Sequence, residues 1–331
     1  MVVVIFGLVS CGRQTHLESE FDEYAARLSR ALEADVPAYQ AVAGLPLDAP
    51  KIEIPRVKMS LLEFLSLFGC ELQYTIGERN SSLGRVATDS QRLLNTLKLL
   101  RQAPGCIERL RQDGREEDAG MLRELVLQKR AQLPALIYNA TLAGPEFREL
   151  WSQAIPEGYP NNINSEVVDG VGKLNGLVER WLSGEFEVDG VELEWVLGQL
   201  RQGDGGALIR TMAISRYELE RAGSIVEARL ARRPVCLMGS SNLMSRTFER
   251  VVSKYFIGSI QVRQAAINRR QFELLVAVEG LEKALYEVLP AAYWRWVLAR
   301  EALVEDYRSA PRAHVAQIKQ VLQQCGSSLG R

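Results

Sequence analysis

The sequence predicts an all-α fold, a multi-helix bundle that follows an irregular, proline-rich N-terminal arm. The 331-residue chain is rich in Leu, Ala, Arg, Glu and Gln, and aromatic residues make up only 7% of it. The abundant residue types lose little side-chain freedom in a helix. Apolar residues also recur at intervals of three and four over most of the chain, whereas the alternation typical of strands is rare.

The N-terminal residues MVVVIFGLVSCG have the form of a bacterial lipoprotein processing site, in which Leu8-Val9-Ser10 precede Cys11. The apolar run is shorter than the roughly 20 residues that cross a bilayer. We therefore expect residues 1–10 to be a signal peptide and Cys11 to carry a lipid that anchors the chain in a membrane. Because Gly12 is not the aspartate that retains lipoproteins in the inner membrane, we expect an outer-membrane protein that faces the periplasm. The alternative is a buried β-strand with a free cysteine.

Residues 11–56 are predicted to form a polar tether, a short helix and an extended arm. The apolar residues from Phe21 to Leu32 have helical spacing, and four prolines between Pro37 and Pro55 then disfavour a helix. Residues 57–331 are predicted to form the helical body. Turn residues fill positions 153–165, where two sub-bundles would meet.

The body begins with an apolar stripe that predicts one amphipathic helix with Ser60 as its N-cap. The stripe consists of Leu61, Leu65, Phe68, Leu72 and Ile76. Further helices are expected at residues 88–102, 115–142, 165–183 and 206–232. Around Asp189-Gly190 the pattern fits either a hairpin or a helix capped by Asp189, and we favour the helix.

After residue 240 helical spacing continues to the end of the chain. Isoleucine, leucine or valine recurs every seven residues, at Ile260, Ile267, Leu274, Leu281 and Val288. The companion positions Gln264 and Gln271 make this seam half polar, which favours a helix inside a bundle over a free coiled coil. Three further features are expected: a helix cap at Gly239-Ser240-Ser241, a buried face of Trp296, Ala299, Leu303 and Tyr307, and a break at Pro311.

The composition argues against several functions. Forty basic and 41 acidic residues give a net charge of −1, and no long run of one sign predicts nucleic-acid binding. With only His16 and His314 and no C-x-x-C motif, we expect no metal site, no cofactor and no catalytic triad. The aromatic residues Tyr293, Trp294, Trp296, Trp151 and Tyr159 could stack on sugars, but their spacing favours a place in the core.

One polar segment stands out after the first predicted helix: Glu78, Arg79, Asn80 and Ser81, followed by Ser82-Leu83-Gly84-Arg85. Arg79 and Asn80 continue the phase of the buried stripe, and a guanidinium there needs a carboxylate or several carbonyl groups. We favour an ion pair that joins two helices. The alternative is a site for an anion or a glycan, because arginine suits carboxylate and phosphate groups.

With Cys11 assigned to lipid, an even number of cysteines remains for an oxidising compartment. Among the three pairings that four cysteines allow, we predict Cys70–Cys106 and Cys236–Cys325. The first would join a helix to the end of the helix that returns beside it, and the second would join the segment after Pro234 to the last helix. The alternative is four buried free thiols.

Three features together resemble an uncharacterised family of gammaproteobacterial lipoproteins that contain a domain of unknown function. They are the processing site at Cys11, the segment ERNSSLGR at 78–85 after Cys70, and the ending His314…Cys325-Gly326. The resemblance covers nearly the whole mature chain, although Gln261-Val262 stands where we would expect Gln-Pro. It implies a location and a helical fold, but no activity.

We therefore expect a lipid-anchored periplasmic protein that is a scaffold or binds an envelope or cell-wall partner, and that is not an enzyme. The rival hypothesis is an enzyme or carrier that binds an anionic cell-wall or lipid fragment through residues 78–85.

Overall fold

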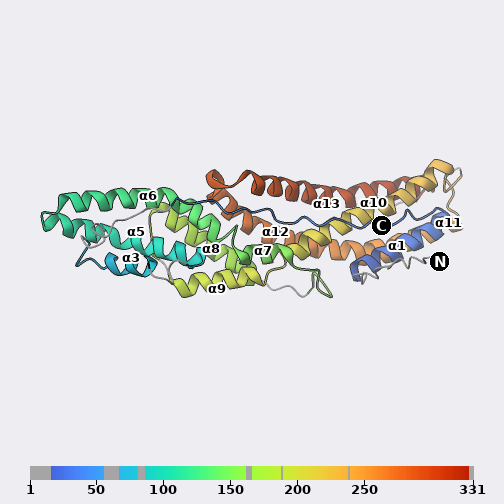
Figure 1. Cartoon of the computed structure of the whole chain (residues 1–331). Helices are drawn as coiled ribbons and strands as arrows, with labels where there is room; N and C mark the ends of the chain where they lie inside the picture. The colour runs from blue at the N-terminus through green and yellow to red at the C-terminus, as the bar shows by residue number, and fades with distance from the viewer. Residues whose placement is uncertain are drawn as a thin grey trace, which may run out of the picture.

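The computed structural model describes residues 16–55, 67–80, 86–161, 166–187, 189–237 and 239–327, without the side chains of residues 78–80. Every regular element within these ranges is a helix. The helices pack into one elongated bundle (Figure 1). The predicted all-α class is confirmed.

The helices form two groups, one at each end of the bundle, and three long helices run between these groups. One end of the bundle is formed by α3 (Leu72–Asn80), α5 (Asp89–Gln112), α6 (Glu116–Ala140), α7 (Pro145–Ser152), α8 (Glu166–Ser183) and α9 (Gly190–Arg201). The other end contains α1 (His16–Leu32), α11 (Leu243–Val251) and the π-helix η1 (Val252–Ile260). The three long helices between the groups are α10 (Gly205–Arg232), α12 (Gln261–Ala284) and α13 (Ala291–Gln324), with the 3₁₀ turn η2 (Tyr286–Val288) before α13.

The bundle contains two hydrophobic cores. The first core lies among α3, α5–α9, the first part of α10, α12 and the first part of α13, around fully buried side chains such as Trp181 and Tyr293. The second core lies among α1, the rest of α10, α11, η1 and the end of α13, around Tyr24 and Phe256. Ile155 contacts both cores. Because α10 and α13 belong to both cores, neither core is separate from the other.

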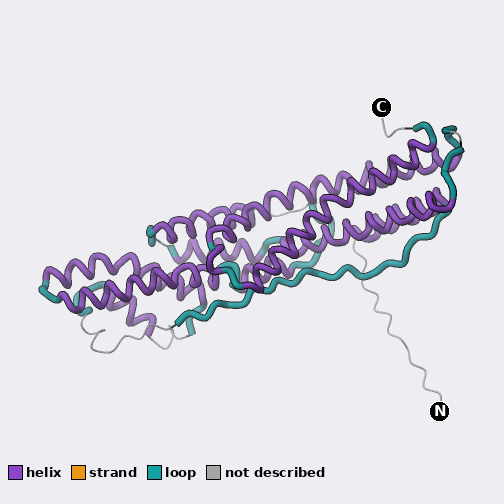
Figure 2. The backbone as a smooth tube through the Cα atoms, turned by 90° about the horizontal axis from the view of Figure 1, so that it is seen from above, coloured by secondary structure: helices purple, strands orange, loops and turns teal. Residues whose placement is uncertain are grey.

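The described part of the arm after α1, residues 34–55, lies extended along the bundle (Figure 2). Near the second core, the Tyr217 hydroxyl accepts a hydrogen bond from the Gln40 amide at 2.6 Å and donates one to the Ala38 carbonyl. Near the first core, the Asn139 amide group pairs with both the N–H and the C=O of Ile52, each at 2.8 Å. The arm is therefore bound through its backbone to helices of both cores.

Several predicted elements are confirmed. Helices α8 and α10 lie within one residue of their predicted ranges. Helix α9 starts after Asp189, whose carboxylate accepts a hydrogen bond from the Val191 amide at 2.8 Å, so the helical alternative holds over the hairpin. Along η1 and α12, the seam from Ile260 to Leu281 is buried, including its glutamines Gln264 and Gln271.

The predicted helix over the stripe 61–76 is wrong in its described part. Residues 67–71 form turns, and α3 begins only at Leu72. Gly69 has a φ of +88°, a left-handed conformation that ends helical geometry. Leu72 and Ile76 are buried as expected, but the Phe68 side chain is 80% exposed, and Leu67 beside it is buried instead. Ser60, Leu61 and Leu65 lie outside the described residues.

Five further expectations are wrong in detail. Helix α13 continues through Pro311, because buried residues on both sides of the proline pack against α10. Ala299 is exposed, and Arg300 takes the buried position beside it. The cap of α11 is Asn242, whose side chain accepts a hydrogen bond from the Ser245 amide at 2.9 Å. Helix α5 also extends ten residues beyond its expected end at 102, and α1 begins within the expected tether.

Candidate functional site

The polar cluster expected at Glu78–Ser81 follows the buried part of α3. Glu78, Arg79 and Asn80 are the last residues of α3, but their side chains lie outside the described part of the chain. Ser81 lies outside it as well, and so does the predicted lipid site Cys11. The roles expected for these residues stay predictions.

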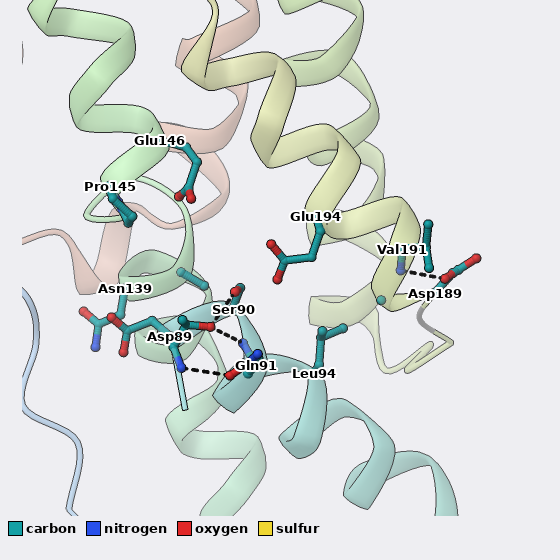
Figure 3. Close-up of a pocket in the computed structure, with 13 residues that line it drawn as sticks. Asp89, Ser90, Gln91, Leu94, Asn139, Pro145, Glu146, Asp189, Val191 and Glu194 are labelled. Atoms are coloured by element: carbon teal, nitrogen blue, oxygen red, sulfur yellow. Dashed lines mark hydrogen bonds between the residues drawn. The ribbon is translucent and has the colours of Figure 1, made fainter. Parts of the chain in front are cut away.

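A hollow of about 460 Å³ lies beside the N-termini of three helices, α5, α7 and α9 (Figure 3). Thr88 caps α5, since its hydroxyl accepts from the Gln91 amide at 3.2 Å and its own N–H donates to the Gln91 side chain at 3.1 Å. Asp189 caps α9 through its carboxylate, which accepts from the Val191 amide. These caps accept hydrogen bonds from backbone N–H groups that have no partner within the first turn of a helix.

The walls of this hollow carry carboxylates. Asp89 forms an ion pair with Lys51 of the arm at 2.5 Å. Figure 3 shows Glu146 on α7 and Glu194 on α9 at opposite sides of the opening. Negative side chains in the first turn stabilise a helix through its dipole, which accounts for Asp89 and Glu146. Within the described residues, no group of histidine, cysteine or acidic side chains has the geometry of a metal site.

The first core contains a buried ion pair that has no signal in the sequence. Arg300 on α13 donates two hydrogen bonds to the two carboxylate oxygens of Glu282 on α12, both at 2.8 Å, and the Tyr293 hydroxyl donates a third at 2.8 Å. Burial alone would lower the pKa of Arg300, but Glu282 outweighs it and the pKa is raised. The guanidinium also lies 5.0 Å from the ring centre of Trp296, as in a cation–π contact.

The aromatic residues near this pair belong to the core, as the favoured interpretation predicted. The ring centres of Trp151 and Trp296 are 4.9 Å apart, and both side chains are buried with Tyr293. Tyr159 is buried too, and its hydroxyl donates to Asp204 at 2.8 Å. These rings are therefore not available to stack on a sugar.

A second ion pair lies beside the first core, with Arg270 buried and Asp204 partly buried. Asp204, at the start of α10, accepts hydrogen bonds from both Nε and a terminal nitrogen of Arg270 on α12. Burial and the neighbouring Asp204 carboxylate raise the pKa of Tyr159. This cluster joins α10, α12 and the loop before α8, so its role is structural.

His314 lies on α13 in the second core. Its Nε2 is 2.8 Å from the Tyr24 hydroxyl, and its ring packs edge-on against Phe256. Burial lowers the pKa of His314 to about 4. A histidine held neutral in this way stabilises the packing of α13 on α1 and η1 at neutral pH.

Both predicted cysteine pairs are present at disulfide distance. The Cys70 and Cys106 sulfurs are 2.05 Å apart, and the Cys236 and Cys325 sulfurs are 2.03 Å apart. The first pair belongs to the first core and the second pair to the second core. Each core therefore has one covalent link.

No helix in the described ranges combines the length and the apolar character that a membrane span requires. A family model described as "Protein of unknown function (DUF3080)" matches residues 21–329. No curated protein and no solved structure matches the chain.

Proposed function

The chain belongs to the DUF3080 family, and we propose from its own residues that it is a lipid-anchored protein of the cell envelope. In this proposal Cys11 carries the lipid in the outer membrane, and the helical body faces the periplasm. The body acts as a scaffold or binds an envelope or cell-wall partner without catalysing a reaction.

The observation that carries this proposal is the presence of one cysteine pair in each core. Disulfides persist in oxidising compartments and are rare where thiols are kept reduced. With Cys70, Cys106, Cys236 and Cys325 all paired, Cys11 is the one cysteine left for another role. Its place after a short apolar run fits lipidation.

The two histidines support the non-catalytic part of the proposal. His314 is buried against Tyr24 and Phe256, where no substrate reaches it. His16 lies at the start of α1, and its Nδ1 is 3.4 Å from a guanidinium nitrogen of Arg263. Neither imidazole is therefore placed as a general base beside a nucleophile. The rival hypothesis, a ligand site at Glu78–Ser81, rests on the sequence alone.

The test of the anchor is a Cys11→Ala variant, fractionated after expression in a Gram-negative host. We expect the wild-type chain in the outer-membrane fraction, and the variant as an unprocessed precursor outside it. Ser19→Ala, which changes an exposed residue of α1, is the matched control and should fractionate as the wild type does. Normal processing and membrane recovery of Cys11→Ala would reject the proposal.

A further inference from the structure

The start of α1 is fixed to the junction of η1 and α12, on the side of the body that contains the second core (Figure 1). Arg263 donates a hydrogen bond to Glu20 at 2.7 Å, and the Ser259 hydroxyl donates to the other oxygen of the same carboxylate. Arg263 also donates to the Tyr159 carbonyl at 2.7 Å. The described chain therefore begins, at His16, against η1 and α12.

The distance from this point to the proposed lipid is short. His16 lies five positions after Cys11 in the sequence. An extended chain covers at most about 3.4 Å per residue, so His16 lies within roughly 17 Å of the modified cysteine. A lipid on Cys11 thus holds the junction of η1 and α12 close to the bilayer surface.

The helix next to this point has an exposed apolar face. Phe272 is 65% exposed, and the other large apolar side chains that α11, η1 and α12 leave exposed are Leu243, Ile257, Val262 and Val276. Val262 directly precedes Arg263, which contacts α1. From Val262 to Val276 the exposed positions advance by three or four residues, so they share one face of α12.

Cations accompany this apolar face. Between residues 243 and 276 the sequence contains six basic residues and two acidic ones, Glu249 and Glu273. Arg246, Arg250, Lys254 and Arg269 are exposed together with the apolar residues. A helix with apolar and basic side chains on one face suits the boundary between lipid headgroups and acyl chains.

We propose that the exposed face of α11, η1 and α12 is a docking surface for an anionic lipid bilayer, on which the body lies along its length. This inference rests on the proposed lipid anchor, which brings the surface to the membrane. The apolar side chains around Phe272 enter the headgroup region, and the arginine and lysine side chains contact the lipid phosphates.

The test uses the full lipidated chain with a tryptophan added at one of two exposed positions. Phe272→Trp places the indole on the proposed surface. Leu298→Trp is the matched control, because Leu298 on α13 is 61% exposed and lies two residues from Arg300, which faces α12. Two residues rotate a helix by about 200°, so Leu298 points away from α12.

Each protein is reconstituted in vesicles of phosphatidylethanolamine and phosphatidylglycerol with brominated acyl chains, and the emission of the wild type is subtracted. We expect the added emission of Phe272→Trp to fall at least twofold relative to unbrominated vesicles, and that of Leu298→Trp to remain unchanged. If the wild type does not float with the vesicles, both the anchor and the docking surface are rejected. If it floats but the two variants are quenched equally, the docking surface alone is rejected.

Discussion

Single residues with buried charge link helices that are far apart in the sequence. Arg300 and Glu282 join α13 to α12, and Arg270 and Asp204 join α12 to α10. The glutamines of the α12 seam could be predicted from the sequence, because they interrupt a regular apolar repeat. The burial of Arg300 could not, because Ala299 beside it fits an apolar face and a guanidinium is buried only when a distant carboxylate pairs with it.

Replacing Arg300 should leave Glu282 buried with Tyr293 as its remaining described partner. We expect Arg300→Met to lower the free energy of unfolding by about 3–5 kcal/mol, measured by urea denaturation. The double variant Arg300→Met/Glu282→Gln should recover part of this loss. Arg295→Met, at an exposed position of the same helix, should change stability by no more than about 0.5 kcal/mol. Equal losses for Arg295→Met and Arg300→Met would contradict a stabilising pair.

His314 should make stability depend on pH. Its pKa is about 4 when folded and about 6.5 in an unfolded chain, so the unfolded state binds more protons between these values. The neutral imidazole therefore makes its full contribution to the free energy of unfolding above about pH 6.5. As the pH falls towards 4, this contribution is lost, and the loss reaches up to ~3 kcal/mol. Thermal unfolding from pH 7 to 4.5 should show this loss in the wild type and less of it in His314→Gln. Identical pH profiles would reject the assignment.

At the scale of whole elements, local spacing predicted most helices, but contacts between distant segments decided how they end. The stripe at 61–76 has good helical spacing, yet Gly69 and the Cys70–Cys106 link interrupt it. Pro311 predicts a break, yet packing on α10 maintains α13 through it. The prolines predicted an extended arm, but not its partners, since Asn139 lies 87 residues from Ile52.

The binding of the arm to α6 should depend on Asn139. Asn139→Leu removes both hydrogen bonds to the Ile52 backbone, and we expect a loss of about 1–3 kcal/mol in unfolding free energy. Hydrogen exchange at the Ile52 amide should accelerate in the same variant. Gln128→Leu also replaces a side-chain amide by leucine, but at an exposed site of α6, and should leave that exchange rate unaltered. Unchanged exchange in Asn139→Leu would show that the arm is held elsewhere.

The two disulfides should contribute according to the chain length that each closes. Cys70 and Cys106 are 36 positions apart, and Cys236 and Cys325 are 89 apart. The loop-entropy model gives about 4 and about 5 kcal/mol respectively. Paired Cys→Ala variants, compared by urea denaturation, should both lose stability, with the larger loss for the longer loop. A loss near zero in either variant would mean that its link does not constrain the unfolded chain.

For the molecule as a whole, two cores share the long helices α10 and α13, and the arm spans both cores along the outside (Figure 2). The fold class and both cysteine pairings could be predicted from composition, spacing and parity. The three-helix hollow around Asp89 and the exposed face of α12 could not, because each depends on how separate helices pack. The polar cluster at Arg79 remains a prediction from the sequence.

The central claim is that Cys11 is lipidated while the other four cysteines are paired. Mass spectrometry of non-reduced peptides from protein purified out of the native envelope tests both parts at once. We predict an N-terminal peptide that begins at acylated Cys11, and two cross-linked peptides that contain Cys70–Cys106 and Cys236–Cys325. A chain that begins at Met1, with an unmodified Cys11 and four thiols open to alkylation, would contradict the account.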